Sequence, residues 1–160
     1  MCATAPLAGP WTGPTMTPAD SPRWLLDTHI VSELARDRPD AEVMRRFAQH
    51  ERALAIPAAV WHELLYGVVR LPVGQRRQRL SDFVEQVAGA LPLLVYDATV
   101  ARVHAGLRAD TAARGRVLCE PDGQIAATAL VHDFTLVTRN GRDFEGITGL
   151  RVENWFEPTH

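Results

Sequence analysis

Short apolar segments that alternate with stretches of helical spacing fix the fold class of this chain. Four such segments lie at residues 24–26, 54–56, 93–96 and 135–138, with a fifth candidate at 152–155. Between them, apolar residues recur every three or four positions, as they do on one face of a helix. Parallel strands need long, usually helical connections and are buried on both faces. We therefore expect an α/β fold: a three-layer α/β/α sandwich with a mainly parallel central sheet.

The first 22 residues follow neither pattern. They contain five of the chain's 11 prolines and show no helical or strand period. We expect a flexible tail over residues 1–22 and one domain over residues 23–160, because a chain of 160 residues has the size of one ordinary domain. The helices of that domain are expected directly after residue 27, over residues 41–49, 58–69, 75–91 and 98–114, and from residue 121 onward.

The charge and the cysteines of the chain limit which ligands it can bind and which kinds of protein it can be. All 17 basic residues are arginine, yet 19 acidic residues leave a formal net charge of −2, so a polyanion must be held by a local arginine patch or by bound cations. Cys2 and Cys119 lack metal-ligand spacing and are too few for a disulfide scaffold. No apolar run approaches the roughly 20 residues that span a bilayer. We expect a soluble cytoplasmic protein without a membrane partner.

Four acidic residues lie where a parallel sheet places its ligands, beyond the carboxyl ends of the strands. Asp27 ends the first strand and Asp143 follows the fourth. Glu63 is the charged residue on the apolar stripe of its helix, and Asp122 opens an otherwise apolar helix. Carboxylates are rarely left on buried stripes unless they are paired or coordinated.

Each acid also has a purely structural interpretation. Asp27 has the position of a helix cap, Asp122 that of a favourable charge at a helix start, and Asp143 that of a turn residue. Glu63 is the hardest to explain in this way, because its neighbours on the stripe are apolar. Four carboxylates at one sheet edge would repel one another, so the arrangement predicts a counter-charge such as Mg²⁺ or Mn²⁺, which prefer oxygen ligands.

At this point the sequence resembles the PIN-domain toxins of the VapC and FitB type. The resemblance covers nearly everything after the tail, and its blocks occur in the family's order: Leu26-Asp27-Thr28 with Ser32-Glu33-Leu34; His62-Glu63-Leu64 with Tyr66-Gly67; Pro121-Asp122 with Gln124-Ile125-Ala126-Ala127-Thr128-Ala129-Leu130; and Thr138-Arg139-Asn140 with Asp143-Phe144 and Leu150-Arg151-Val152-Glu153-Asn154-Trp155. One block alone is weakly specific, whereas four in order are specific.

The resemblance implies that residues 23–160 form a PIN domain that is a metal-dependent endoribonuclease. It implies that Asp27, Glu63, Asp122 and Asp143 are the catalytic, metal-binding acids for Mg²⁺ or Mn²⁺. Thr28 and Asn140 would orient carboxylates or water. The implied partners are the RNA substrate, cut to leave a 5′-phosphate and a 3′-hydroxyl, and a small antitoxin protein that inhibits the enzyme.

Several arginines are candidates for binding substrate or partner. Arg139 and Arg142 flank the proposed site and are the stronger candidates for substrate phosphate. A second group, around the loop and helix after Pro72, either holds RNA phosphates or an acidic antitoxin segment, or forms a solvated helix face; its members are Arg70, Arg76, Arg77 and Arg79. We also expect a homodimer, with apolar helix residues such as Phe83, Val84 and Val87 exposed for a partner helix or a second copy of the chain, and with the antitoxin's C-terminal segment lying across the acidic cleft.

Two residues depart from the family pattern. His29 stands where the family usually has a small or neutral residue, and it either donates a hydrogen bond to the site or points away from it; protonated, it would add positive charge and make activity depend on pH. Gly123 is a poor helix former beside Asp122, and the sequence assigns it no role.

Other functions fit less well. The helix at His62-Glu63 begins like a zinc-protease motif, but Tyr66 stands where the second histidine would be. A dehalogenase-like phosphotransferase would need an aspartate where His29 stands. The alternative that stays open is a non-catalytic PIN-fold module that binds RNA or protein, which would predict a damaged set of acids.

Overall fold

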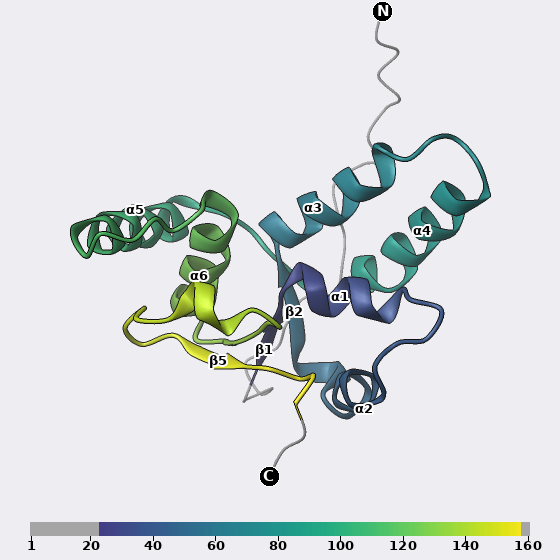
Figure 1. The fold of residues 1–160 in the computed structure, drawn as a ribbon, viewed down its shortest axis with the longest axis horizontal. Helices are drawn as coiled ribbons and strands as arrows, with labels where there is room; N and C mark the ends of the chain where they lie inside the picture. Colours follow the sequence, from purple (N-terminus) through teal and green to yellow (C-terminus); the bar gives the residue numbers. More distant parts are fainter. Residues whose placement is uncertain (1–22, 158–160) are drawn as a thin grey trace, which may run out of the picture.

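The computed structural model describes residues 23–157, so the expected tail over residues 1–22 lies outside the described residues. Strands and helices alternate along the chain (Figure 1). The strands are β1 Trp24–Leu26, β2 Leu54–Pro57, β3 Leu93–Leu94, β4 Thr135–Val137 and β5 Arg151–Glu153. The α-helices are α1 Thr28–Leu34, α2 Ala41–Gln49, α3 Ala58–Val69, α4 Gln75–Gln86, α5 Ala98–Ala113 and α6 Glu120–His132, with 3₁₀ turns η1 Glu51–Ala53, η2 Ala88–Ala90 and η3 Gly141–Phe144.

The five strands form one parallel sheet in the order β3-β2-β1-β4-β5. The chain moves outward from β1 through β2 to β3 and then returns to β4 on the other side of β1. Because such crossovers are right-handed, the helices before β3 and those after it must cover opposite faces. Figure 1 shows α1 to α4 on one side of the sheet and α5 with α6 on the other. The predicted α/β class and parallel sheet are confirmed.

The change of direction between β1 and β4 positions the functional site. All three residues of each of these strands are buried, because helices cover both faces. Their carboxyl ends lie side by side, with Leu26 paired to Val137. In a sheet of this kind ligands bind at the point where the strand order reverses. Asp27 follows β1 directly at that point.

Two expectations about packing need correction. The third strand ends at Leu94 and not at residue 96, and Val95 and Tyr96 are exposed. β3 pairs with β2 only at Ile56 and Pro57, and β2 ends there. The apolar face of α4 is also largely covered, because α3 packs on it: Val84 is buried in the core, whereas Phe83 is half-buried and lines a groove. The prediction that Val84 is exposed was wrong, while Phe83 stays partly exposed.

Within residues 23–157, no helix is both long and apolar enough to cross a membrane.

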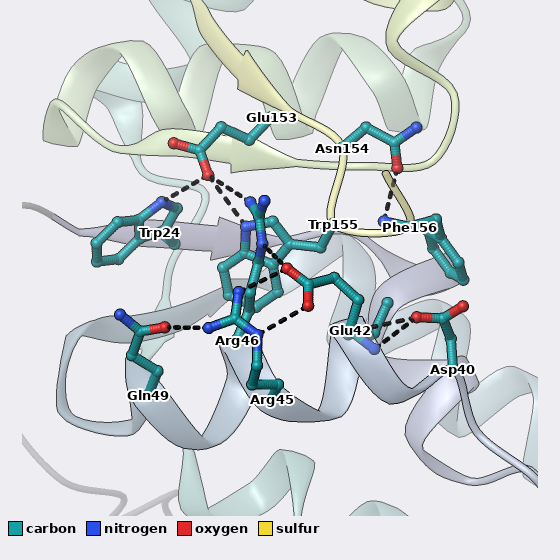
Figure 2. A network of polar contacts seen from close by, with 11 residues as sticks. Trp24, Asp40, Glu42, Arg45, Arg46, Gln49, Glu153, Asn154, Trp155 and Phe156 are labelled. Atoms are coloured by element: carbon teal, nitrogen blue, oxygen red, sulfur yellow. Dashed lines mark hydrogen bonds and ion pairs between the residues drawn. The ribbon is translucent and has the colours of Figure 1, made fainter. Parts of the chain in front are cut away.

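A polar network ties the end of the sheet to α2 (Figure 2). One carboxylate oxygen of Glu153, Oε2, accepts hydrogen bonds from the indole N–H groups of Trp24 (3.2 Å) and Trp155 (3.0 Å) and lies 3.6 Å from Arg46 Nη1. Arg46 is largely buried and also bonds to Glu42 at 3.0 Å. The network therefore fixes the chain after β5, including the fully buried Trp155.

Replacing Glu153 with alanine is expected to lower the free energy of unfolding by about 1–3 kcal/mol, because two indole N–H groups lose their acceptor and Arg46 loses one of its carboxylate partners. Glu153→Gln should cost less, since its amide oxygen still accepts a hydrogen bond. Chemical denaturation measures both, with Glu85→Ala on the exposed face of α4 as the control. Equal stability of Glu153→Ala and the control would contradict this role.

Candidate active site

The first component of the site is Asp27, at the carboxyl end of β1. It is largely buried and caps α1, with its Oδ1 accepting the backbone N–H of Thr28 at 2.7 Å. Its other oxygen, Oδ2, accepts the hydroxyl of Thr138 at 2.7 Å. Thr138 is fully buried and follows β4, so this bond joins the two strand ends at the point where the strand order reverses. Asp27 therefore caps α1, and hydrogen bonds to both of its oxygens fix the orientation of its carboxylate.

Thr28 and Asn140 extend this arrangement to two further acids. The hydroxyl of Thr28 donates a short hydrogen bond to Glu63 Oε2, which brings α3 to the amino end of α1. The backbone N–H of Asn140 donates to the Thr138 hydroxyl at 3.1 Å, and its side-chain amide donates to Asp143 Oδ2 on η3. A continuous chain of hydrogen bonds thus links Glu63, Asp27 and Asp143.

Asp122, at the start of α6, completes the acidic group. Burial raises its pKa, and the negative charges of Asp143 and Asp27 raise it further; the Cys119 thiol, which donates to Asp122 Oδ2 at 2.8 Å, and nearby His29 act in the opposite direction. Asp122 therefore lies close enough to Asp143 and Asp27 for their charges to act on it. The structure therefore brings all four predicted acids to one edge of the sheet.

His29 points toward this group and not away from it. Its Nδ1 lies 3.3 Å from Asp27 Oδ2, while the side chain remains about two-thirds exposed. Of the two orientations left open by the sequence, the structure selects the one that contacts the acidic group. His29 can therefore supply a hydrogen bond, or a positive charge when protonated, at the solvent side of Asp27.

Sequence reasoning gave Thr138 and Cys119 no role, yet both contact an acid of the site. Thr138 had a detectable signal, since a hydroxyl residue directly after a buried strand lies at the same edge as Asp27. Cys119 had none, because its contact depends on the turn that precedes α6. The thiol of Cys119 has a raised pKa, because it is partly buried, donates to Asp122 and lies near Asp122 and Asp143.

The structure also gives Gly123 a role. A Cβ atom at this position would lie 2.3 Å from Nε2 of His104 on α5, so only glycine lets the imidazole pack against the start of α6. His104 Nδ1 is hydrogen-bonded to the Tyr96 hydroxyl at 2.9 Å, whereas Nε2 has no partner among the described residues. The contact holds α5 against the helix that carries Asp122.

We expect the protein to lose stability as the pH falls below about 6.5. Burial lowers the pKa of His104, with Glu120 opposing and Arg108 reinforcing the shift. The unfolded chain therefore binds this proton more readily than the folded one, so the stabilisation is complete above the unfolded pKa and falls as the pH drops toward the folded value. Denaturation between pH 8 and pH 5 measures it.

His50 contributes to the same trend, because burial lowers its pKa as well. The control is His62→Gln, which removes an exposed histidine and should leave the slope unchanged, whereas His104→Gln should flatten it. A slope identical in His104→Gln and in the unaltered protein would contradict the account.

The residues present fit a hard divalent cation. Within residues 23–157, no three His, Cys, Asp or Glu side chains are placed closely enough to ligate one ion directly. Mg²⁺ keeps several waters and needs only one or two direct carboxylates, so it does not require such a cluster. The donors of the acidic group are carboxylate oxygens, and the raised pKa of Asp122 reflects in part the negative charges of Asp143 and Asp27. Both features favour a hydrated divalent ion.

A cleft of about 290 Å³ adjoins the acidic group and is lined by His29, Ser32, Glu33, Arg36, Arg139 and Phe156. Of the two arginines predicted to bind substrate, Arg139 lines this cleft, with its guanidinium carbon 4.6 Å from the centre of the Phe156 ring. Arg142 lies exposed on η3 beside Asp143. Of the second arginine group, Arg76 and Arg79 line a larger groove of about 560 Å³ next to Arg36.

The chain is similar in sequence and in structure to known proteins of one family. The model of the PIN domain family matches residues 24–150. The chain is 36% identical to the "VapC ribonuclease Y4jK" of Sinorhizobium fredii, over 84% of this chain and 98% of that protein. It is 32% identical to "Toxin FitB" of Neisseria gonorrhoeae, over 75% and 89% of the two chains. A solved structure of FitAB bound to an IR36 DNA fragment superimposes with a TM-score of 0.77 at 29% identity, covering 86% of this chain and 98% of the other.

Proposed function

Because this chain belongs to the PIN-domain family, we propose that it is a metal-dependent endoribonuclease that acts as the toxin of a toxin–antitoxin pair. The observation that carries the proposal is the intact acidic group at the reversal of strand order. A non-catalytic relative would not need to keep four carboxylates together against their mutual repulsion. The names of the relatives, a ribonuclease and a toxin, agree with both parts of the proposal.

In the proposed mechanism, Asp27, Asp122 and Asp143 would hold a hydrated Mg²⁺ or Mn²⁺ ion, with Glu63 hydrogen-bonded to Thr28 beside them. When bound, the ion supplies a Lewis acid for the phosphodiester and lowers the pKa of a coordinated water. The protein's own part is to fix the ligands. Thr138 holds Asp27, and Asn140 holds Asp143, so that neither carboxylate has to reorganise when substrate arrives.

Substrate binding falls to positive groups at the rim, because the formal net charge of the chain is −2. Arg139 and Arg142 flank the segment that carries Asn140 and Asp143, and a guanidinium binds phosphate oxygens in a bidentate way. These arginines would hold the phosphates on either side of the bond that is cut.

An antitoxin partner is part of the proposal. The groove beside Arg36, Arg76 and Arg79 also contains the apolar side chains Leu80 and Phe83. This combination suits an amphipathic, acidic segment of a partner protein, with its apolar residues against α4 and its carboxylates against the arginines. Gel filtration of the toxin with and without the co-expressed antitoxin measures both this complex and the proposed homodimer.

The function is tested by incubating antitoxin-free protein with total RNA and Mg²⁺ or Mn²⁺, followed by mapping of the cut ends. Internal cuts that leave 5′-phosphates are expected, and expression of the chain alone should arrest bacterial growth. Asp122→Asn should remove both effects while the protein stays folded. Full toxicity of that variant, or RNA left intact by the unaltered protein, would overturn the proposal.

A further inference from the structure

The cleft beside the acidic group has the size and position of a subsite. Its volume of about 290 Å³ lies near the lower end of small-molecule sites, which begin at about 300 Å³. Two of its lining residues connect it to the acids: His29 touches Asp27, and Arg139 separates Thr138 from Asn140. A ligand in the cleft would therefore lie directly beside the place where a phosphodiester is cut.

One wall of the cleft is a stacked pair. The guanidinium of Arg139 lies over the Phe156 ring at 4.6 Å from its centre. Phe156 is held in place by its neighbours: its backbone N–H donates to Asn154 Oδ1 at 3.0 Å, and it follows the fully buried Trp155 (Figure 2). The ring is thus a pre-organised aromatic surface on a fixed piece of chain, half-exposed to the cleft.

The charge of the cleft differs from that of the neighbouring acidic group. Its one carboxylate, Glu33, is buried and already bound by Arg36 (3.0 Å) and by the backbone N–H of Asp40 (2.9 Å). Burial raises the pKa of Glu33, but these hydrogen bonds and the charge of Arg36 outweigh it, so the net shift is downward. With Glu33 neutralised by Arg36, the free charge that faces the cleft is that of Arg139, with His29 adding to it when protonated.

We propose that this cleft binds the nucleotide that flanks the cut bond in single-stranded RNA, with its base stacked on the Arg139–Phe156 pair. The inference rests on the proposed function and names the substrate's binding mode. A ligand for this surface needs a flat aromatic part for the stack and an anionic part for the guanidinium, and an unpaired nucleotide offers both. Single-stranded RNA is commonly held by bases stacked on aromatic and arginine planes.

The test measures cleavage kinetics and binding for Phe156→Ala and Phe156→Leu, the second keeping apolar bulk without a flat ring. For both variants, KM should rise about 5- to 100-fold, which corresponds to the free energy of one base–aromatic stack. The kcat should change little, and the mapped cut sites should become less selective. Phe156→Tyr should restore the KM. Arg139→Ala should raise KM as well, whereas Arg108→Ala, on the exposed side of α5, should not.

A binding measurement separates this inference from the proposed function. In an Asp143→Asn background, the affinity for a fluorescein-labelled single-stranded RNA is read by anisotropy. A 5- to 100-fold loss with Phe156→Leu supports the subsite even if the unaltered protein cuts no RNA, in which case the proposed function alone fails. Unchanged affinity, KM and cut sites would overturn the subsite. The subsite would also be overturned if the Phe156 variants bound RNA normally but no longer bound the antitoxin, because the cleft would then be the binding site of that partner.

Discussion

Asp27→Asn is expected to lower the rate of RNA cleavage by about 100- to 1,000-fold. The substitution keeps the size of the side chain and an oxygen for the N–H of Thr28, but it removes the charge that would bind a cation. Loss of several kcal/mol of charge stabilisation in the transition state corresponds to this factor. Single-turnover cleavage of RNA measures it.

The matched control is Asp110→Asn, which makes the same chemical change on the exposed side of α5. It should cleave at the original rate. Thermal denaturation of both variants separates loss of activity from loss of fold, because Asp27 also caps α1 and accepts the Thr138 hydroxyl. A folded Asp27→Asn variant that cleaves within a few-fold of the original rate would contradict the assignment of this residue.

Gly123→Ala is expected to lower the free energy of unfolding by about 1–3 kcal/mol, although alanine is the better helix former. The new Cβ would lie 2.3 Å from Nε2 and 2.6 Å from Cδ2 of His104, which is buried and tied to Tyr96. The imidazole or the start of α6 must therefore move. Because Asp122 precedes this position, cleavage should fall together with stability.

Gly106→Ala provides the control, since Gly106 lies in α5 with no atom within 4 Å of an added Cβ. It should be stabilised by up to about 1 kcal/mol. The double variant His104→Ala with Gly123→Ala should lose less stability than the sum of the single changes, because removing the imidazole removes the clash. Additive losses, or equal stability of the two glycine variants, would contradict the packing described.

The sequence predicted the elements well, and it also predicted that the four acids lie near one edge of the sheet, because both depend on local patterns. The strands before Asp27 and before Thr138 are apolar runs, and Glu63 was identified as a charge on an apolar stripe. The sequence could not predict that β1 and β4 are neighbours, because strand order depends on contacts between distant segments. The position of Thr138 at the same edge as Asp27 was predictable, but the bond between them requires β1 and β4 to be neighbours.

The sequence also could not predict which side chains pack against one another. An apolar stripe shows that a helix packs on something, but it does not show on what, so Val84 was expected to be exposed and is buried. Gly123 had no explanation until its neighbour His104, 19 positions earlier, was placed beside it. The contact between Phe156 and Arg139 has no sequence signal either, because it joins two segments that the fold brings together.

Direct measurement of Mn²⁺ binding tests the central claim, that the acids share a divalent cation. The free-ion signal in electron paramagnetic resonance reports bound Mn²⁺ without requiring RNA or cleavage. The unaltered protein should bind Mn²⁺ at the site, Mg²⁺ should displace it, and the double variant Asp27→Asn with Asp122→Asn should bind at least about tenfold more weakly, or not at all. Equal Mn²⁺ affinity of the folded double variant and the unaltered protein would contradict it.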